Sequence, residues 1–145
     1  MSKRLAWMRR AAVAVIGVGL VWAAAAEEKF HTRLAPVSMD ATMRATVAGL
    51  GTATATLAGS KLTISGTFEG LLSPATTAQL RLSRVAGVRG PAVFDLTVTH
   101  ATSGSLSGSV DLSSDQGEAL RKGRFYIQIQ SEKAPDGNLW GWLMR

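Results

Sequence analysis

The sequence predicts an all-β protein: an antiparallel Ig-like or Greek-key β-sandwich of seven to nine strands, with one short helix near its C-terminal third and a signal peptide before it. Two observations predict the sandwich. Apolar and polar residues alternate along several short segments, and clusters of turn-forming residues separate these segments. A third observation, a basic stretch followed by an apolar run and small residues, predicts the signal peptide.

Residues 1–26 have the composition of a secretory signal. Four basic residues precede an apolar run over residues 11–22, and four alanines follow it before Glu27. We therefore expect a mature N-terminus at Glu27 and a periplasmic or secreted protein. The apolar stretch to residue 26 is shorter than the roughly 20 residues that span a bilayer. An uncleaved helix that anchors the protein to the inner membrane is the alternative.

The charge of the whole chain does not indicate nucleic-acid binding. The formal net charge is +6, but four of the sixteen basic residues lie in the predicted signal, which leaves a balance of +2. There are no cysteines, so neither a disulfide nor a thiolate metal site is expected. The remaining length suits one domain. We expect an N-terminal tail or first strand over residues 27–42 and the sandwich domain over residues 43–145.

The alternation is typical of strands with one buried face. It runs through residues 52–57, 61–68, 78–83, 94–99 and 106–112. One segment departs from it: Ser113 stands three residues before Gln116, at the spacing of a capping box, and Gly123 follows two cations. This pattern predicts a short helix over residues 114–122. Gly117 within it costs about 1 kcal/mol relative to alanine.

Two apolar-alternating strands are expected at the C-terminus, over residues 124–130 and 134–143, joined by the Pro135-Asp-Gly turn. The aliphatic residues of each strand should face the core. The inward set is Phe125, Ile127, Ile129, Leu139, Gly141 and Leu143. The outward set is Tyr126, Gln128, Gln130, Trp140 and Trp142.

Several segments resemble the CHRD domain, a module named after chordin and found alone in bacterial secreted proteins. They are Gly70–Leu82, Arg89-Gly-Pro91, the helix with Gly123, and the closing hairpin. The resemblance implies a β-sandwich of that type and an exported protein. Typical members carry histidines where this chain has Gln79, Arg81 and Gln130, and an acid where it has Asn138. Guanidinium is no metal ligand and amides are poor ones, so we expect no metal and no cofactor.

The resemblance also places Gln79 and Arg81 in the same sheet as the C-terminal strands. Tyrosine, tryptophan and arginine are enriched at protein interfaces, and aromatic rings also stack on sugars. The predicted partner-binding residues are Gln79, Arg81, Tyr126, Gln128, Gln130, Trp140 and Trp142. The predicted function is that of an exported, non-catalytic binding or accessory module with a protein partner, periplasmic or membrane-associated. A module that binds an extracellular glycan is the alternative, and a metal-binding redox domain is third. A membrane partner is expected only if the N-terminal segment is retained.

Several of these residues also suit simpler roles. Trp140 and Trp142 could form the buried face, Gln79 and Gln130 could be ordinary solvated residues, and Arg81 could pair with Glu118 or Asp95 at the surface. His31 and His100 have no partner at ligand spacing and are expected at the surface. The turn serines have no accompanying histidine, so nucleophilic catalysis would lack a base and no enzyme activity is expected.

Overall fold

The structure is a computed structural model that describes residues 26–37 and 40–145. Apart from Ala26, the predicted signal peptide lies outside the described residues. No helix in the described part of the chain is long and apolar enough to cross a membrane.

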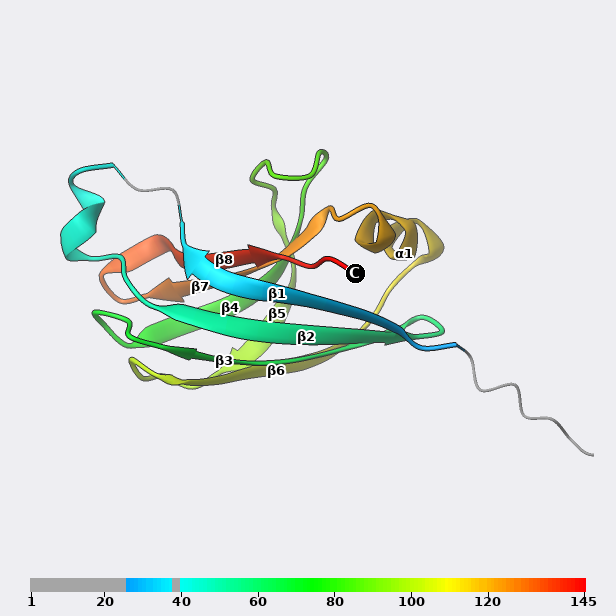
Figure 1. The fold of residues 1–145 in the computed structure, drawn as a ribbon, viewed down its shortest axis with the longest axis horizontal. Coiled ribbons are helices and arrows are strands. Elements are labelled where there is room, and N and C mark those ends of the chain that lie inside the picture. Colours follow the sequence, from blue (N-terminus) through cyan, green and yellow to red (C-terminus); the bar gives the residue numbers. More distant parts are fainter. Residues whose placement is uncertain (1–25, 38–39) are drawn as a thin grey trace, which may run out of the picture.

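Eight strands, one α-helix and one 3₁₀ helix make up the described residues (Figure 1). The strands are β1 (Glu28–Pro36), β2 (Leu50–Ala58), β3 (Lys61–Glu69), β4 (Ala75–Leu82), β5 (Ala92–Val98), β6 (Gly104–Asp111), β7 (Phe125–Ser131) and β8 (Ala134–Trp142). The helices are η1 (Met43–Ala45) and α1 (Ser114–Arg121). The first strand, β1, thus lies within residues 27–42, and η1 begins after them.

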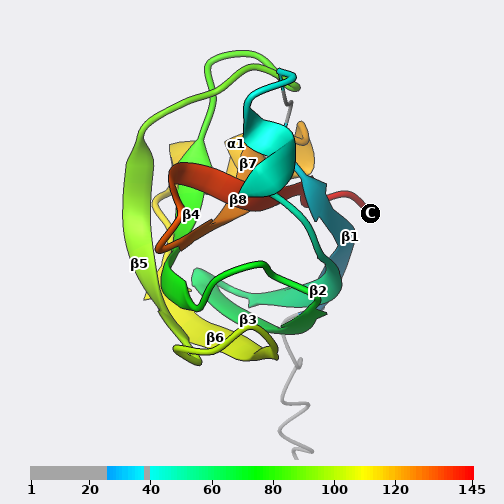
Figure 2. The same cartoon turned by 90° about the vertical axis from the view of Figure 1, so that its left-hand side faces the viewer.

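The strands close into one antiparallel barrel in the order β1-β2-β3-β6-β5-β4-β7-β8, as the end-on view shows (Figure 2). The prediction of a β-sandwich is therefore wrong. The barrel closes because β1 and β5 each change their pairing partner along their length. β1 pairs with β2 over Glu28–Leu34 and with β8 at Ala35 and Pro36. β5 pairs with β4 from residue 92 to residue 96 and with β6 at Thr97 and Val98.

The chain crosses the barrel between β3 and β4 and again between β6 and β7, at opposite ends. The second crossing contains α1, which lies at the barrel end near the C-terminus (Figure 1). Its predicted capping box is confirmed: the Ser113 hydroxyl accepts from the Gln116 N–H, and the Gln116 side chain accepts from the Ser113 N–H. Leu120 is fully buried in the barrel core, which anchors this short helix.

The barrel interior is filled mainly by the aliphatic and aromatic residues that the alternation assigned to the core, to which β1 adds Phe30 and Leu34. Phe125, Ile127, Ile129, Leu139 and Leu143 all belong to this cluster, as predicted. A second, smaller cluster lies outside it, where the segment that contains η1 covers part of β8. Its members are Val37, Val47 and Ala134, with Met43 and Trp140 packed against them.

The prediction that the turn between the last two strands lies at Pro135-Asp-Gly is also wrong. The β7–β8 turn is at Glu132 and Lys133, because Ser131 pairs with Ala134. The next pair is Ile129 with Leu139. Residues 135–138 therefore lie opposite Gln130 alone and form a large, irregular bulge in β8. The Asn138 carbonyl accepts from the Val37 N–H at 3.0 Å, which ties the bulge to the end of β1.

Candidate binding face

One wall of the barrel, formed by the outward side of β4, β7 and β8, carries all seven predicted partner-binding residues. The register places Gln79 opposite Gln128, which is opposite Trp140. Arg81 is opposite Tyr126, which is opposite Trp142. We call this surface the β4–β7–β8 wall. Alternation predicted the outward side chains of β7 and β8, and the family resemblance placed Gln79 and Arg81 beside them.

Polar side chains on the wall form a continuous hydrogen-bonded chain. Gln79 Oε1 accepts from Arg81 Nη1 at 2.7 Å and from Gln130 Nε2 at 3.0 Å. Gln130 Oε1 in turn accepts from the Thr77 hydroxyl at 2.7 Å. Each group thus has a fixed partner within the wall, which makes the chain a rigid element.

Tyr126 connects the wall to the loop over residues 83–91. Its hydroxyl donates to the Gly90 carbonyl at 3.0 Å and accepts from the Gly90 N–H at 2.9 Å. Arg81 Nε lies 3.1 Å from the same hydroxyl and 2.9 Å from the Gly90 carbonyl. Two of the predicted contact residues therefore hold the base of this loop.

The wall is more covered than the sequence suggested. Tyr126, Gln128 and Gln130 are 0%, 2% and 9% exposed, so the expectation that they form an open surface is wrong. The loop over residues 83–91 covers Tyr126, and the bulge over residues 135–138 covers Gln128, whose Nε2 donates to the Asp136 carbonyl at 3.3 Å. Gln79 and Arg81 are partly exposed.

Three aromatic rings form a cluster on the wall. Tyr126 and Trp142 have centroids 4.4 Å apart with planes tilted by 39°, while Tyr126 and Trp140 meet edge to face at 5.9 Å. The guanidinium of Arg89 lies over the Trp140 ring, 5.3 Å from its centroid, and donates to the Asp136 carbonyl. Both tryptophans are partly exposed and point away from the barrel core. The alternative that they form the barrel core face is therefore wrong.

The surface ion pair suggested for Arg81 does not form. Both ion pairs of the described residues involve Glu28, which meets Arg121 at 2.8 Å and Arg145 at 2.6 Å. The hydrogen bonds from Arg121, with the positive charges of both arginines, hold the pKa of Glu28 below its ordinary value. This trio joins β1, α1 and the C-terminus, away from the wall.

Asn138 is buried within the bulge. Its Nδ2 donates to the Ser131 hydroxyl at 2.8 Å, but its Oδ1 has no hydrogen-bond partner among the described residues. The backbone of Asn138 is what fixes the bulge to Val37.

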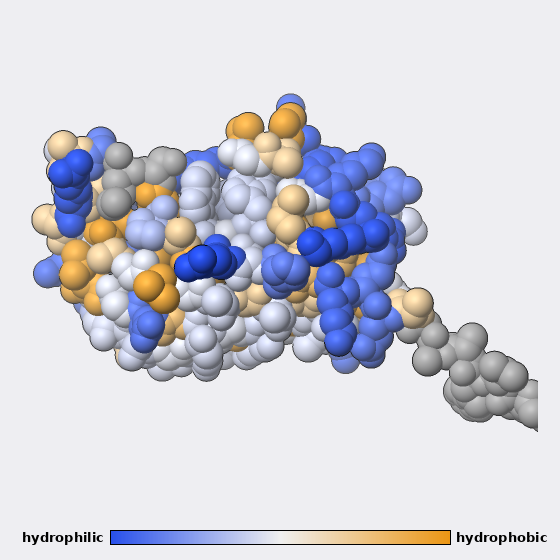
Figure 3. All heavy atoms as spheres, in the orientation of Figure 1, coloured by the Kyte–Doolittle hydropathy of each residue, from blue (hydrophilic) through white to orange (hydrophobic). Residues whose placement is uncertain are grey.

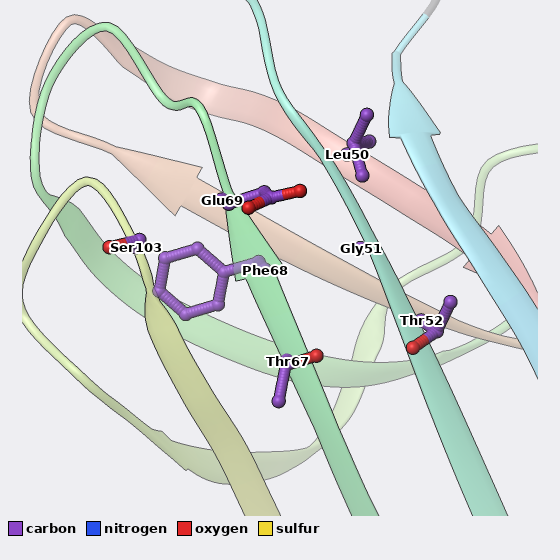
Figure 4. Close-up of a pocket in the computed structure, with 7 residues that line it drawn as sticks. All are labelled: Leu50, Gly51, Thr52, Thr67, Phe68, Glu69 and Ser103. Carbon is purple, nitrogen blue, oxygen red and sulfur yellow. The ribbon is translucent and has the colours of Figure 1, made fainter.

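A shallow hollow lies elsewhere on the barrel, across β2 and β3 (Figure 4). Leu50, Gly51 and Thr52 line it from β2, and the neighbouring strand and a loop contribute Thr67, Phe68, Glu69 and Ser103. Glu69 is the one ionisable residue in this lining. A single carboxylate beside hydroxyl groups provides neither a pair of carboxylates nor a nucleophile with a base, so we do not assign chemistry to the hollow.

The two histidines are exposed and lie on different elements: His31 is on β1 and His100 is in the loop before β6. Over residues 26–37 and 40–145, no three side chains of histidine, cysteine, aspartate or glutamate gather as a metal site.

A family model for the CHRD domain matches residues 30–143. The chain belongs to the CHRD domain family. The match begins within β1 and ends just after β8, so it spans the whole barrel. No curated protein and no solved structure matched the chain.

In this CHRD domain, the three positions at which the resemblance led us to expect histidine lie next to one another. They are Gln79, Arg81 and Gln130, joined through Gln79 Oε1. Sequence reasoning missed Thr77, Arg89 and Gly90. The Arg89-Gly-Pro segment signalled a turn, but nothing in its pattern indicates that it folds over β7 and β8.

Proposed function

We propose that this CHRD domain is an exported, non-catalytic binding module that engages a protein partner through its β4–β7–β8 wall. The main support for this proposal is the cluster of Trp140 and Trp142 against the buried Tyr126, with Arg89 over the Trp140 ring. Tryptophan, tyrosine and arginine dominate the binding energy of protein interfaces, and anchors held rigidly lose little entropy on binding. The order of basic, apolar and small residues over positions 1–26 supports export.

The hydrogen-bonded polar network supports a binding role over a catalytic one. Gln79, Arg81 and Gln130 bond to one another, and Arg81 also bonds to Tyr126 and Gly90. Amide and guanidinium groups are poor general bases and poor nucleophiles. They instead keep the aromatic cluster and the neighbouring loop in one conformation.

A protein partner fits the wall better than a sugar does. Arg89 occupies one face of the Trp140 ring, and Tyr126 packs against Trp142. The two tryptophan planes are also inclined by 59° to each other, so they do not form one flat platform. A sugar ring stacks best on an open aromatic face, whereas protein side chains fill an irregular surface.

Site-specific photocrosslinking tests the proposal. The Asp136 side chain is exposed, and only its carbonyl takes part in hydrogen bonds, so a photoreactive residue at position 136 leaves the wall intact. The control carries the same residue at position 63, exposed on β3. We expect a protein adduct in the periplasmic or secreted fraction from position 136 alone. Equal adducts from both positions, or none, would contradict the proposal.

The tryptophans provide the second half of the test. Trp142→Ala should weaken binding to the crosslinked partner at least tenfold. It should unfold more readily than wild type, but less so than Ile127→Ala in the core, which costs about 2 to 5 kcal/mol. Trp140→Ala should fall between them because Trp140 also packs on Val37 and Val47. Binding unchanged by Trp142→Ala would exclude the wall as the contact. Retention of a glycan on an array, lost in Trp142→Ala, would favour the glycan alternative.

A further inference from the structure

The loop over residues 83–91 projects from the side of the barrel between β4 and β5 (Figures 1 and 2). Its tip carries Val85 and Val88, which are 62% and 56% exposed, the two most exposed large apolar side chains of the described residues. In the space-filling view, apolar atoms protrude at the top of the molecule, where this loop lies (Figure 3). Two apolar side chains exposed side by side on a protruding loop are candidates for contact with another surface.

The base of the loop is fixed on both sides. The Ser83 N–H donates to the Arg124 carbonyl at 2.9 Å, and Arg124 Nε donates back to the Ser83 carbonyl at 2.8 Å. On the other side, Gly90 is bonded to the Tyr126 hydroxyl and to Arg81. Both ends of the loop are therefore fixed by hydrogen bonds to residues in or beside β4 and β7.

The tip itself is a tight turn. The Val88 N–H donates to the Val85 carbonyl at 3.2 Å, and Gly87 has a φ of +85°, as the third residue of a type II turn requires. This turn places the two valines at either end of Ala86-Gly87. Their exposure thus follows from hydrogen-bonded geometry.

The charged residues within the loop itself have one sign. Arg84 and Arg89 flank the valines, and residues 83–91 contain no acid. Arg89 uses one nitrogen on the Asp136 carbonyl, and Arg84 is exposed and forms no ion pair with any described residue. An apolar tip between two guanidinium groups is complementary to a surface with anionic headgroups above hydrocarbon.

We propose that this loop tip docks on an anionic phospholipid surface, with Val85 and Val88 entering the interfacial layer and Arg84 and Arg89 meeting headgroup phosphates. A protein pocket suits this tip less well because valine is under-represented among interface hot spots. The docking goes beyond the proposed function, since it uses the two valines and Arg84, leaves Trp142 free and shares only Arg89 with the wall. A weak, reversible contact is expected from two valines and two arginines.

Single-cysteine labelling of the full chain tests this docking. The chain has no cysteine, so Ala86→Cys places an environment-sensitive dye at the tip alone. Thr63→Cys, exposed on β3, serves as the matched control. With vesicles of phosphatidylglycerol and phosphatidylcholine, the dye at position 86 should shift to the blue and be quenched by acyl-chain quenchers. The dye at position 63 should not respond, whether or not the N-terminal segment itself enters the bilayer.

Two variants test which side chains of the loop cause the response of the dye. Val85→Ser combined with Val88→Ser should abolish the response at position 86, and Arg84→Gln should weaken vesicle binding of the tip about fivefold. These side chains are exposed, so the fold should be kept. No response at position 86, an equal response at both dye positions, or the same response to pure phosphatidylcholine would overturn the proposal. A response to the crosslinked protein partner but not to vesicles would do the same, and would leave the proposed wall contact standing.

Discussion

At the scale of single residues, the alternation along a strand determined which way a side chain points but not whether it is exposed to solvent. Tyr126, Gln128 and Gln130 point out of the barrel, as their position between Phe125, Ile127 and Ile129 required. All three are nevertheless buried, because a loop and a bulge from elsewhere in the chain cover the wall. Their polar atoms then need partners, and the network around Gln79 and Gly90 provides them.

Tyr126→Phe measures what one hydroxyl contributes to this arrangement. The change leaves the Gly90 N–H without its acceptor and removes a partner of Arg81, so the free energy of unfolding should fall by about 1 to 3 kcal/mol. Urea unfolding is the measurement. Ser65→Ala is the control, since it removes an exposed hydroxyl that lies 3.4 Å from that of Thr54 and should change stability by less than about 0.5 kcal/mol. Equal effects of the two changes would show that the Tyr126 bonds are dispensable.

At the scale of elements, local signals succeeded where the element is defined by its own residues. The capping box and Gly123, with a φ of +70°, bound α1 as expected. The Pro135-Asp-Gly signal misled because the same residues also suit a bulge. Which of the two forms depends on the local pairing of Ser131 with Ala134 and on the tertiary hydrogen bond from Val37 to Asn138.

Gly117→Ala should stabilise the protein. Gly117 lies within α1, its φ is not in the left-handed region, and the nearest atom to an added methyl group is the flexible Arg121 Nη1 at 3.7 Å. The helix gains about 0.5 to 1 kcal/mol, which corresponds to a rise of about 2 to 4 °C in melting temperature. Differential scanning calorimetry measures it. A lower melting temperature would mean that the space beside Gly117 is needed for docking α1.

At the scale of the whole molecule, barrel closure depends on the junction of β1 with β8. The strands pair at Ala35 and Pro36, and His31 exchanges two backbone hydrogen bonds with Met144. Between these contacts lies Gly141, where a side chain would meet Thr32 Oγ1 and would stand 2.5 Å from the Arg33 carbonyl oxygen. The glycine thus permits the close approach of the first and last strands.

Gly141→Ala should destabilise the barrel by about 3 kcal/mol, because the obstructing Arg33 oxygen belongs to the backbone and cannot move aside. The matched control is Gly108→Ala on β6, where the obstructing atom is the flexible end of Leu96 at 2.6 Å and a smaller loss is expected. Urea unfolding of both variants provides the comparison. A loss at Gly141 no larger than at Gly108 would show that the junction tolerates separation.

The pH dependence of stability should reveal the ion pairs of Glu28, which join β1 to α1 and to the C-terminus. The pKa of Glu28 is lowered by its bonds to Arg121 and by the charges of both arginines, so its contribution is present at neutral pH and is lost as the pH falls through the lowered pKa. Glu28→Gln should therefore melt below wild type at pH 7, and the difference should shrink as the pH falls through the lowered pKa of Glu28. A difference that stays the same throughout an acid titration would assign the effect to packing.

The sequence alone determined the strands from β2 to β8, the helix, most of the core residues that these elements carry, and which side chains of each strand point outward. These follow from periodicity, capping and turn chemistry, which act over a few neighbouring residues. Only the tertiary structure decided that β1 and β5 change partners and close a barrel, and that residues 83–91 and 135–138 cover the wall. A sandwich and a barrel require the same alternation of buried and outward residues, so the choice between them rests on pairings between segments far apart in the chain, which no local pattern encodes.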